Sequence, residues 1–424
     1  MSGRRRARRG LALLLAGDAV SITGTSMTTI AVPWFVLTTT GSAARAGVAA
    51  FVSLLPIVIS AIFGGAIADR MGHRRFSVVS DLASGVLTAA IPVLFLTTGL
   101  GFAPMLALLF GRWLLASPGE TARRALVPAL AGAGAVRMER ATAAFDAVSR
   151  GARMVGAPLA GVLIAVFGAT RLGPVALLFV DAATFLVSAL LIGCGVPRAG
   201  HDAAPPAGGR DLDGYLARLR EGLAFLWREP VLRALSVMIL VTNMLNVGWA
   251  QVLLPVYTRE VLGDPRALGL LLGVYGGGAM VGALAYGAVG ARLPRRKTYA
   301  SCFLAGSVPV MLVFAVQAPF VALIGVQALS GLVSGALNPL ISVVEFERIP
   351  ARLRARVMGA GDAGAYAGMP VGGLLAGTLA GSIGLTATML AFAAIYLVAC
   401  LPPFVGKVWR GLDARIGLAV QPNE

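Results

Sequence analysis

Twelve long apolar stretches constrain this chain more than any other feature. Each is close to the roughly 20 residues that a helix needs to cross the hydrocarbon core of a bilayer. With 57% hydrophobic residues and a mean hydropathy of +0.82, 424 residues hold far more apolar side chain than a soluble domain can bury. We therefore predict an all-α membrane protein with twelve transmembrane helices. The stretches are 11–39, 45–68, 77–98, 103–122, 141–168, 173–195, 232–258, 267–290, 298–316, 319–343, 356–380 and 385–406.

The positive charge follows the connections between these stretches. The net charge of +17 would suit a nucleic-acid-binding protein. However, the arginines and lysines gather in the N-terminal tail, in every second connection and in the C-terminal tail, and Arg123 to Arg140 are assigned to one such connection. The opposite connections hold only Arg45, Arg171, Arg259 and Arg266. The positive-inside rule then predicts a multi-pass protein of the bacterial inner (cell) membrane with both termini cytoplasmic, and no nucleic acid as partner.

A polar segment divides the chain into halves. Residues 199–209 are rich in Ala, Gly and Pro, as a flexible linker is, and 211–229 alternate Leu and aromatic residues with charges at helical spacing. We predict an amphipathic helix on the cytoplasmic face for the latter. The predicted organisation is a six-helix bundle at 1–195, a cytoplasmic linker with its amphipathic helix at 196–230, and a second six-helix bundle with a short cytoplasmic tail at 231–424.

The two halves repeat one another. The segment 65–75 (GAIADRMGHRR) has a degenerate copy 222 residues later at 287–297 (GAVGARLPRRK), and the same offset relates Pro33 to Pro255. Residues 156–161 (GAPLAG) similarly match 368–373 (GMPVGG). Parallel repeats of this kind form secondary transporters whose substrate site lies near the bilayer midplane, between the repeats.

The first copy carries a complete motif, G-x-x-x-D-R-x-G-x-R-R. Its residues are Gly65, Asp69, Arg70, Gly72, Arg74 and Arg75. On this motif the chain resembles the major facilitator superfamily over essentially its whole length. The resemblance implies two pseudo-symmetric six-helix bundles and a cytoplasmic gate in which Asp69 meets a second-half arginine such as Arg352 or Arg356. Ala291 stands where Asp69 would recur, so the gate is predicted to be asymmetric.

Short sequence pairs in and between the first two apolar stretches resemble those of the family's bacterial drug, macrolide and siderophore exporters. These pairs are Pro33-Trp34, Gly41-Ser42 and Leu55-Pro56. The fifth stretch also resembles, imperfectly, the glycine-proline signature of antiporters, which implies a hinge there. Ordinary packing of small residues between membrane helices is the alternative. The hinge candidates are Gly151, Gly156, Pro158 and Gly161.

Ionisable residues inside apolar stretches are functional candidates, because a charge at bilayer depth is costly. Asp18, Arg112, Asp181 and Asp362 are candidates for proton coupling, and the alternative for each is a buried structural pair. The resemblance links an arginine at the position of Arg112 to proton transfer, although the rest of that motif is absent. Asp81, at the start of the third stretch, is expected near the membrane interface.

A drug exporter needs a largely apolar cavity with a few hydrogen-bonding groups. In the resembled family, the first, fourth, seventh and tenth helices line that cavity. Each candidate side chain has simple packing as its alternative. The candidates are Met27, Trp34, Asn243, Asn246, Trp249, Gln251, Tyr275 and Asn338.

The sequence thus predicts a secondary active transporter that exports lipophilic or amphipathic small molecules by proton antiport through alternating access. The alternative is a proton-coupled transporter of one specific metabolite, such as a siderophore, a self-made antibiotic or a nutrient. There is no phosphate-binding loop for nucleotides, and the two histidines, His73 and His201, form no cluster, so no enzyme activity, catalytic residue, metal or cofactor is expected. We expect a monomer whose partners are its small-molecule substrate, protons and membrane lipids.

Overall fold

The computed structural model describes residues 2–167, 173–197, 212–350 and 353–413, and in these ranges every regular element is a helix. Helices occupy each of the twelve predicted apolar stretches. Nine helical spans among the described residues are long and apolar enough to cross a membrane. The other three predicted stretches also form helices, but these are interrupted, charged or only partly described and do not meet this criterion of length and hydropathy. The helices are therefore consistent with twelve membrane crossings, of which nine meet the criterion in the described ranges.

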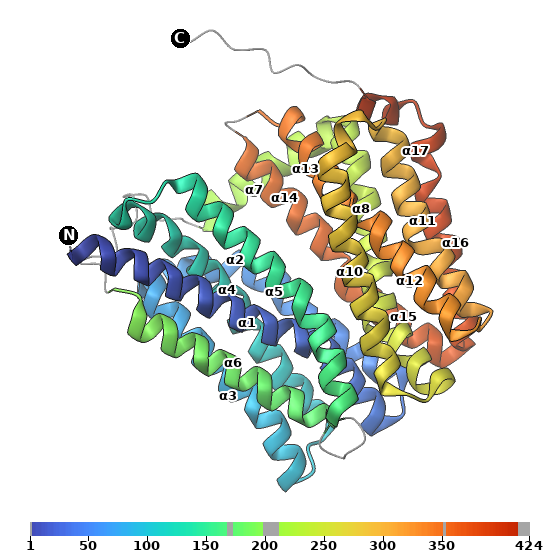
Figure 1. Cartoon of the computed structure of the whole chain (residues 1–424), viewed down its shortest axis with the longest axis horizontal. Helices are drawn as coiled ribbons and strands as arrows, with labels where there is room; N and C mark the ends of the chain where they lie inside the picture. The colour runs from blue at the N-terminus through green and yellow to red at the C-terminus, as the bar shows by residue number, and fades with distance from the viewer. Residues whose placement is uncertain (1, 168–172, 198–211, 351–352, 414–424) are drawn as a thin grey trace. The chain divides into compact units, whose positions relative to one another are not determined.

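The chain divides into two compact units. The first holds Met1–Asp211 with Thr258–Gly269, and the second holds Leu212–Tyr257 with Leu270–Glu424. In the first unit α1, α3, α4 and α6 pack side by side, with α5 against α1 and α2 against α4 (Figure 1). Its helices are α1 (Ser2–Thr40), α2 (Ala43–Met71), α3 (His73–Thr97), α4 (Phe102–Gly134), α5 (Met138–Phe167) and α6 (Gly173–Gly195).

The second unit begins with α7 (Leu212–Arg228), which covers the predicted amphipathic segment and packs against α14. Several predicted spans consist of more than one helical element, with interruptions at Gly335–Ala336, at Gly368 and at Leu401 and a π-helix within the stretch 232–258. The elements that follow along the chain are α8 (Pro230–Gly248), the π-helix η1 (Trp249–Leu253), α9 (Leu254–Tyr257), the π-helix η2 (Thr258–Leu262), α10 (Pro265–Val289), the 3-10 turn η3 (Gly290–Arg292), α11 (Arg295–Ala315), α12 (Phe320–Ser334), α13 (Leu337–Arg348), α14 (Arg354–Ala367), α15 (Met369–Ile383), α16 (Leu385–Cys400), α17 (Pro402–Val405) and the 3-10 turn η4 (Val408–Asp413). Of these, η2 and the start of α10 belong to the first unit.

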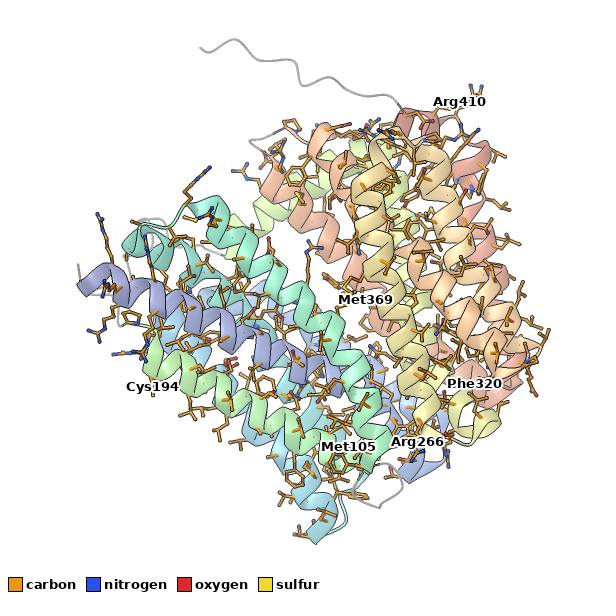
Figure 2. All side chains as sticks on the ribbon, in the orientation of Figure 1. Met105, Cys194, Arg266, Phe320, Met369 and Arg410 are labelled. Carbon is orange, nitrogen blue, oxygen red and sulfur yellow. The ribbon has the colours of Figure 1, made fainter. Side chains whose placement is uncertain are left out.

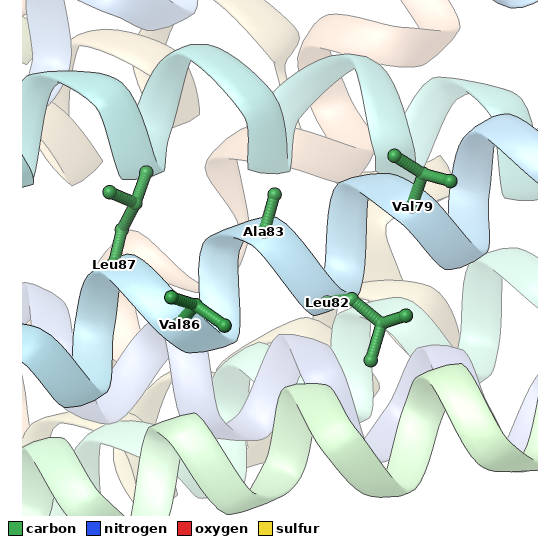
Figure 3. Close-up of a pocket in the computed structure, with 5 residues that line it drawn as sticks. All are labelled: Val79, Leu82, Ala83, Val86 and Leu87. Carbon is green, nitrogen blue, oxygen red and sulfur yellow. The ribbon is translucent and has the colours of Figure 1, made fainter.

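Helix α3 is built with its polar face inward and its apolar face outward. Asp81, Ser84 and Thr88 are fully buried, whereas Val79 and Val86 are 50% and 68% exposed. Figure 3 shows the outward face, an open hollow lined only by the apolar side chains Val79, Leu82, Ala83, Val86 and Leu87. In water this arrangement would be unstable, but in a bilayer the apolar face meets lipid and the polar groups find partners inside the bundle.

Two arginines join helix ends in the first unit. The Arg8 Nε donates to the Gly134 carbonyl at 2.8 Å, which links the start of α1 to the end of α4. The Arg74 guanidinium donates to the carbonyls of Gly193 and Val196, which links the start of α3 to the end of α6. Figure 2 labels Cys194 at this end and Met105, near the start of α4, at the other end. The basic tail and the basic connections of this unit therefore lie at one end of its bundle.

The second copy of the motif makes the same type of contact. Arg296, which lies 222 residues after Arg74, donates its guanidinium to the carbonyls of Pro403 and Phe404 in α17, beyond the end of α16. Thus the start of α11 is joined to the end of the second half, just as the start of α3 is joined to the end of α6 in the first half. The sequence repeat is therefore matched by equivalent contacts within each unit.

The boundary of the fourth stretch was predicted wrongly. The apolar run stops at residue 122, but α4 continues to Gly134. Arg123 was assigned to a loop, whereas it lies within α4, is only 3% exposed and pairs with the buried Asp81 of α3. The reason is that these charges pair with one another inside the bundle, so hydropathy ends the span before the helix ends.

Candidate functional site

Helix α4 places two arginines inside the first unit. Arg112 and Arg123 lie eleven residues apart, close to three helical turns, so they project from similar faces about 16 Å apart along the axis. Both are buried among α1, α3 and α6. Each organises a separate group of polar side chains.

The Arg112 cluster consists of Thr28, Thr88, Arg112 and Asp181. The Arg112 Nη2 lies 2.5 Å from Asp181 Oδ2, and both side chains are fully buried. The Arg112 Nε donates to Thr88 Oγ1 at 2.9 Å, and the Thr28 hydroxyl donates to Asp181 Oδ2 at 2.6 Å. Four helices, α1, α3, α4 and α6, thus meet at one neutral ion pair.

One nitrogen of this arginine remains unsatisfied. Among the described residues, the buried Arg112 Nη1 has no hydrogen-bond partner, and neither has the buried Nε1 of Trp113. The guanidinium carbon lies 4.5 Å from the centre of the Trp113 ring and 5.3 Å from that of Phe185. Aromatic faces stabilise a cation, but they do not replace an acceptor for the free N–H. The cluster can therefore accept another hydrogen-bonding group.

The Arg123 cluster consists of Asp18, Asp81, Arg123, Ser149 and Ser188. The Arg123 Nε donates to Asp18 Oδ1 at 2.8 Å, and Nη1 donates to Asp81 Oδ1 at 2.7 Å. The Ser149 hydroxyl donates to Asp18 Oδ2 and the Ser188 hydroxyl to Asp81 Oδ2, both at 2.7 Å. Five helices meet here, because α5 contributes Ser149.

Polar side chains at spacings of three and four residues connect the two clusters. On α3, Asp81, Ser84 and Thr88 share one buried face, and the Ser84 hydroxyl lies 3.4 Å from the Arg112 carbonyl that it donates to. On α1, Asp18, Ser21 and Thr28 are also buried, at spacings of three and seven residues. On α6, Asp181, Thr184 and Ser188 follow one another at spacings of three and four residues. The Thr184 hydroxyl donates to Asp181 Oδ1 at 3.3 Å.

The structure thus assigns three of the four proton-coupling candidates to two clusters. Asp181 and Arg112 form one pair, whereas Asp18 lies in the other cluster. Asp362 is in α14, but its side chain lies outside the described residues. Asp81 and Arg123 were missed as site residues, because Arg123 follows the apolar part of α4 and the pairing of helix faces is not visible in the sequence.

The predicted cavity residues fall in both units. Met27 and Trp34 are buried within α1 of the first unit. In the second unit, Asn243 Nδ2 donates to the Ala365 carbonyl at 3.3 Å. Asn246 Nδ2 donates to the Tyr396 hydroxyl at 3.4 Å and its Oδ1 accepts from Ser307 at the same distance. These amides therefore connect helices within their own unit.

Trp249 and Gln251 lie on η1, where the helix widens to π geometry. Pro255 supplies a reason, because it has no N–H to donate to the carbonyl of Gln251. Trp249 packs edge-to-face on Phe314, with the ring centres 5.0 Å apart. Tyr275 on α10 and Asn338 on α13 are exposed.

The gate motif is described only in part. Gly72 joins α2 to α3 with a φ of 83°, a conformation that favours glycine. The side chains of Gly65, Asp69 and Arg70 lie outside those described, as do Arg352 and the side chain of Ala291. Arg356, a suggested partner of Asp69, bonds to Glu221 of α7 at 2.6 Å, and its predicted contact with Asp69 stays a prediction. Arg75 is exposed.

The predicted hinge in α5 packs closely on α1. A β-carbon on Gly156 would lie 2.8 Å from the Thr23 carbonyl oxygen, whereas one on Gly151 would meet nothing within 4 Å. The side chains of Pro158 and Gly161 are not among those described. In the second unit Gly372 packs against the backbone of Met244 in α8 in a similar way. Close packing is therefore shown for Gly156 and not for Gly151.

The arrangement of helices and repeats fits one known family. The sequence profile described as Major Facilitator Superfamily matches residues 14–268 and 237–415. The chain belongs to the Major Facilitator Superfamily. It is 34% identical to the multidrug efflux pump Tap of Mycolicibacterium fortuitum over 390 residues, which are 91% of this chain and 93% of that protein. It is 33% identical to the multidrug efflux pump Tap of Mycobacterium tuberculosis, over 92% of this chain and 91% of that one.

Solved structures show the same fold. The nucleoside transporter NupG superposes with a TM-score of 0.75, covering 93% of this chain and 99% of that one at 12% sequence identity. At that identity the likeness concerns the fold alone. Together with the apolar spans, membership of the superfamily makes this chain a multi-pass membrane transporter of small molecules. Among the described residues, no group of three or more metal-ligating side chains is present.

Proposed function

We propose that this transporter exports lipophilic or amphipathic drugs across the bacterial inner membrane in exchange for protons. Two multidrug efflux pumps named Tap, each about one third identical over almost the full chain, support the substrate class. The Arg112 cluster carries the proposal for the mechanism, because it is a fully buried ion pair with one unsatisfied donor. The charge pattern supports an orientation with both termini in the cytoplasm.

The Arg112–Asp181 pair would couple the proton to movement by a change of charge. When Asp181 takes up a proton, its attraction to Arg112 falls, and the contacts that join α1, α3, α4 and α6 weaken together. Release of the proton restores them. Such a two-state contact can bias the outward-open and inward-open states that alternating access requires.

The remaining site residues take supporting roles in this proposal. Met27, Trp34 and Trp249 offer apolar and aromatic surface to a substrate, and Asn243, Asn246 and Gln251 offer hydrogen bonds. The motif that includes Asp69 and Gly72 acts as the cytoplasmic gate. Asp362 stays a candidate for a second carboxylate involved in transport.

A drug-susceptibility panel in an efflux-deficient host tests the substrate class. Expression of the chain should raise resistance to several unrelated lipophilic drugs, and Asp181→Asn should abolish that gain at an equal amount of protein in the membrane. The matched control is Asp146→Asn, which changes an exposed aspartate paired with Arg124. Unchanged resistance to every drug, with growth altered on one nutrient, would instead identify a transporter of a specific metabolite.

A further inference from the structure

The Arg123 cluster differs from the Arg112 cluster in its charge balance. It holds two carboxylates and one guanidinium, so it carries one net negative charge when all three are ionised. Asp18 and Asp81 are fully buried and Arg123 is 3% exposed. A net charge inside a membrane bundle is costly, and one bound proton would neutralise it.

The hydrogen bonds of the Arg123 cluster suit both protonation states. Each carboxylate accepts one N–H from Arg123 and one hydroxyl, from Ser149 for Asp18 and from Ser188 for Asp81. A serine hydroxyl is both donor and acceptor, so it can turn and accept from a protonated carboxyl group. The proton can therefore be bound by either carboxylate without moving a helix.

Four nearby charged residues on α4 and α5 are paired outside this cluster. Glu120, one turn before Arg123, acts electrostatically on it, but its carboxylate is bonded to Arg153 of α5. Arg124 and Asp146 pair with each other at the surface, where they are 63% and 40% exposed. On α6, the nearest charge described along the buried face is Asp181, two turns before Ser188 and bonded to Arg112.

Polar side chains of α3 lie between this cluster and the Arg112 cluster, where the Thr88 hydroxyl donates to the Ser84 carbonyl and the Ser84 hydroxyl to the Arg112 carbonyl. The separation of about 16 Å along α4 is too long for one transfer, but Thr88, Ser84 and Asp81 on α3 divide it into steps of one helical turn. Thr88 bonds to Arg112 and Asp81 bonds to Arg123, so the series begins and ends at the two arginines.

We infer that the Arg123 cluster is a second proton-binding site, which receives the proton from the Arg112 cluster along the polar face of α3 and releases it toward the end of the bundle that holds the basic connections. The direction of movement rests on the proposed function, but the binding of the proton does not. The proton enters as H⁺ from water and leaves as H⁺, and in between it occupies an oxygen of Asp18 or Asp81. Bound there, it brings the net charge of the cluster to zero.

Infrared titration of the purified protein tests this inference directly. The band of protonated carboxyl groups is followed as the buffer is made acidic, with no drug and no gradient present. The wild type should take up about one proton in this cluster, and Asp18→Asn or Asp81→Asn should each remove that uptake, because one carboxylate and one guanidinium already balance. Asp146→Asn is the matched control and should keep the wild-type band.

A milder variant guards against loss of folding. Ser188→Ala retains all charges and removes only the hydroxyl that donates to Asp81, so it should change the pH at which the band titrates. If Asp18→Asn, Asp81→Asn and Ser188→Ala all titrate as the wild type does and only lower the melting temperature, the cluster is a structural ion network and the inference is wrong. Failure of the wild type to exchange drug for protons would count against the proposed function and not against this site.

Discussion

Arg112 and Arg123 occupy the same helix but meet different numbers of carboxylates. Arg112 has one, Asp181, and forms a neutral pair, whereas Arg123 has two, Asp18 and Asp81. Removing one member of a buried pair leaves an uncompensated charge, which costs more than the pair itself contributes. The two arginines should therefore respond differently to substitution.

Substitution of Arg112 should be strongly destabilising and partly reversible by a second change. Arg112→Ala should lower the free energy of unfolding by about 3–5 kcal/mol, because Asp181 stays buried without its partner. The double variant Arg112→Ala/Asp181→Ala should be more stable than Arg112→Ala alone. Unfolding in detergent measures both.

The control for this pair is Arg124→Ala, which breaks an exposed bond to Asp146 and should change stability by about 0–1 kcal/mol. Equal losses of unfolding free energy from Arg112→Ala and Arg124→Ala would contradict the burial of the Arg112–Asp181 pair. A double variant that is no more stable than Arg112→Ala would contradict it as well.

Individual residues could be found from the sequence only when a charge interrupts an apolar run. Asp18, Arg112 and Asp181 do so and were identified, but their partners could not be. Pairing depends on which helix faces meet, as when Arg123 reaches α1 and α3 at once. Arg123 itself was missed because it follows the apolar part of α4.

At the scale of elements, close packing depends on small residues at particular positions. Helix α5 approaches α1 at Gly156, where the Thr23 carbonyl leaves no room for a side chain. Gly151 lies one and a half turns earlier on the same helix and faces open space. The sequence marked both as hinge residues, since composition alone cannot distinguish a packed glycine from an exposed one.

The same substitution at these two glycines should have opposite effects. Gly156→Ala should destabilise the protein by about 1–3 kcal/mol, because the added methyl group forces α5 away from α1. Gly151→Ala should be neutral or stabilising by up to about 1 kcal/mol, because alanine favours the helix. Melting temperatures of the two purified variants check this, and a similar fall for both would contradict the packing.

At the scale of the molecule, the two units use the same device to join their helices. Arg74 and Arg296 occupy equivalent positions in the repeat and donate to carbonyls at the end of the last helix in their own half. The sequence predicted the repeat because the segments 65–75 and 287–297 match at an offset of 222 residues. It did not predict the carbonyl partners, which carry no side-chain signal.

Loss of either arginine should weaken its own unit to a similar degree. Arg74→Ala and Arg296→Ala should each cost roughly 1.5–3 kcal/mol, the usual range for hydrogen bonds to a charged group. Their exposed neighbours in the repeat, Arg75 and Lys297, serve as matched controls, and Arg75→Ala and Lys297→Ala should have little effect. Limited proteolysis of the full chain, with cleavage followed separately in each half, measures the loss of stability. A large effect of only one of the two substitutions would contradict the equivalence of Arg74 and Arg296.

Drug–proton exchange in liposomes containing the purified chain tests the central claim most directly. An imposed pH gradient should drive a lipophilic drug across the membrane against proton flow, and a protonophore should abolish it. Asp181→Asn should bind the drug but lose the response to the gradient. Drug movement that persists unchanged after the gradient is collapsed, or in Asp181→Asn, would contradict proton-coupled export through the Arg112 cluster.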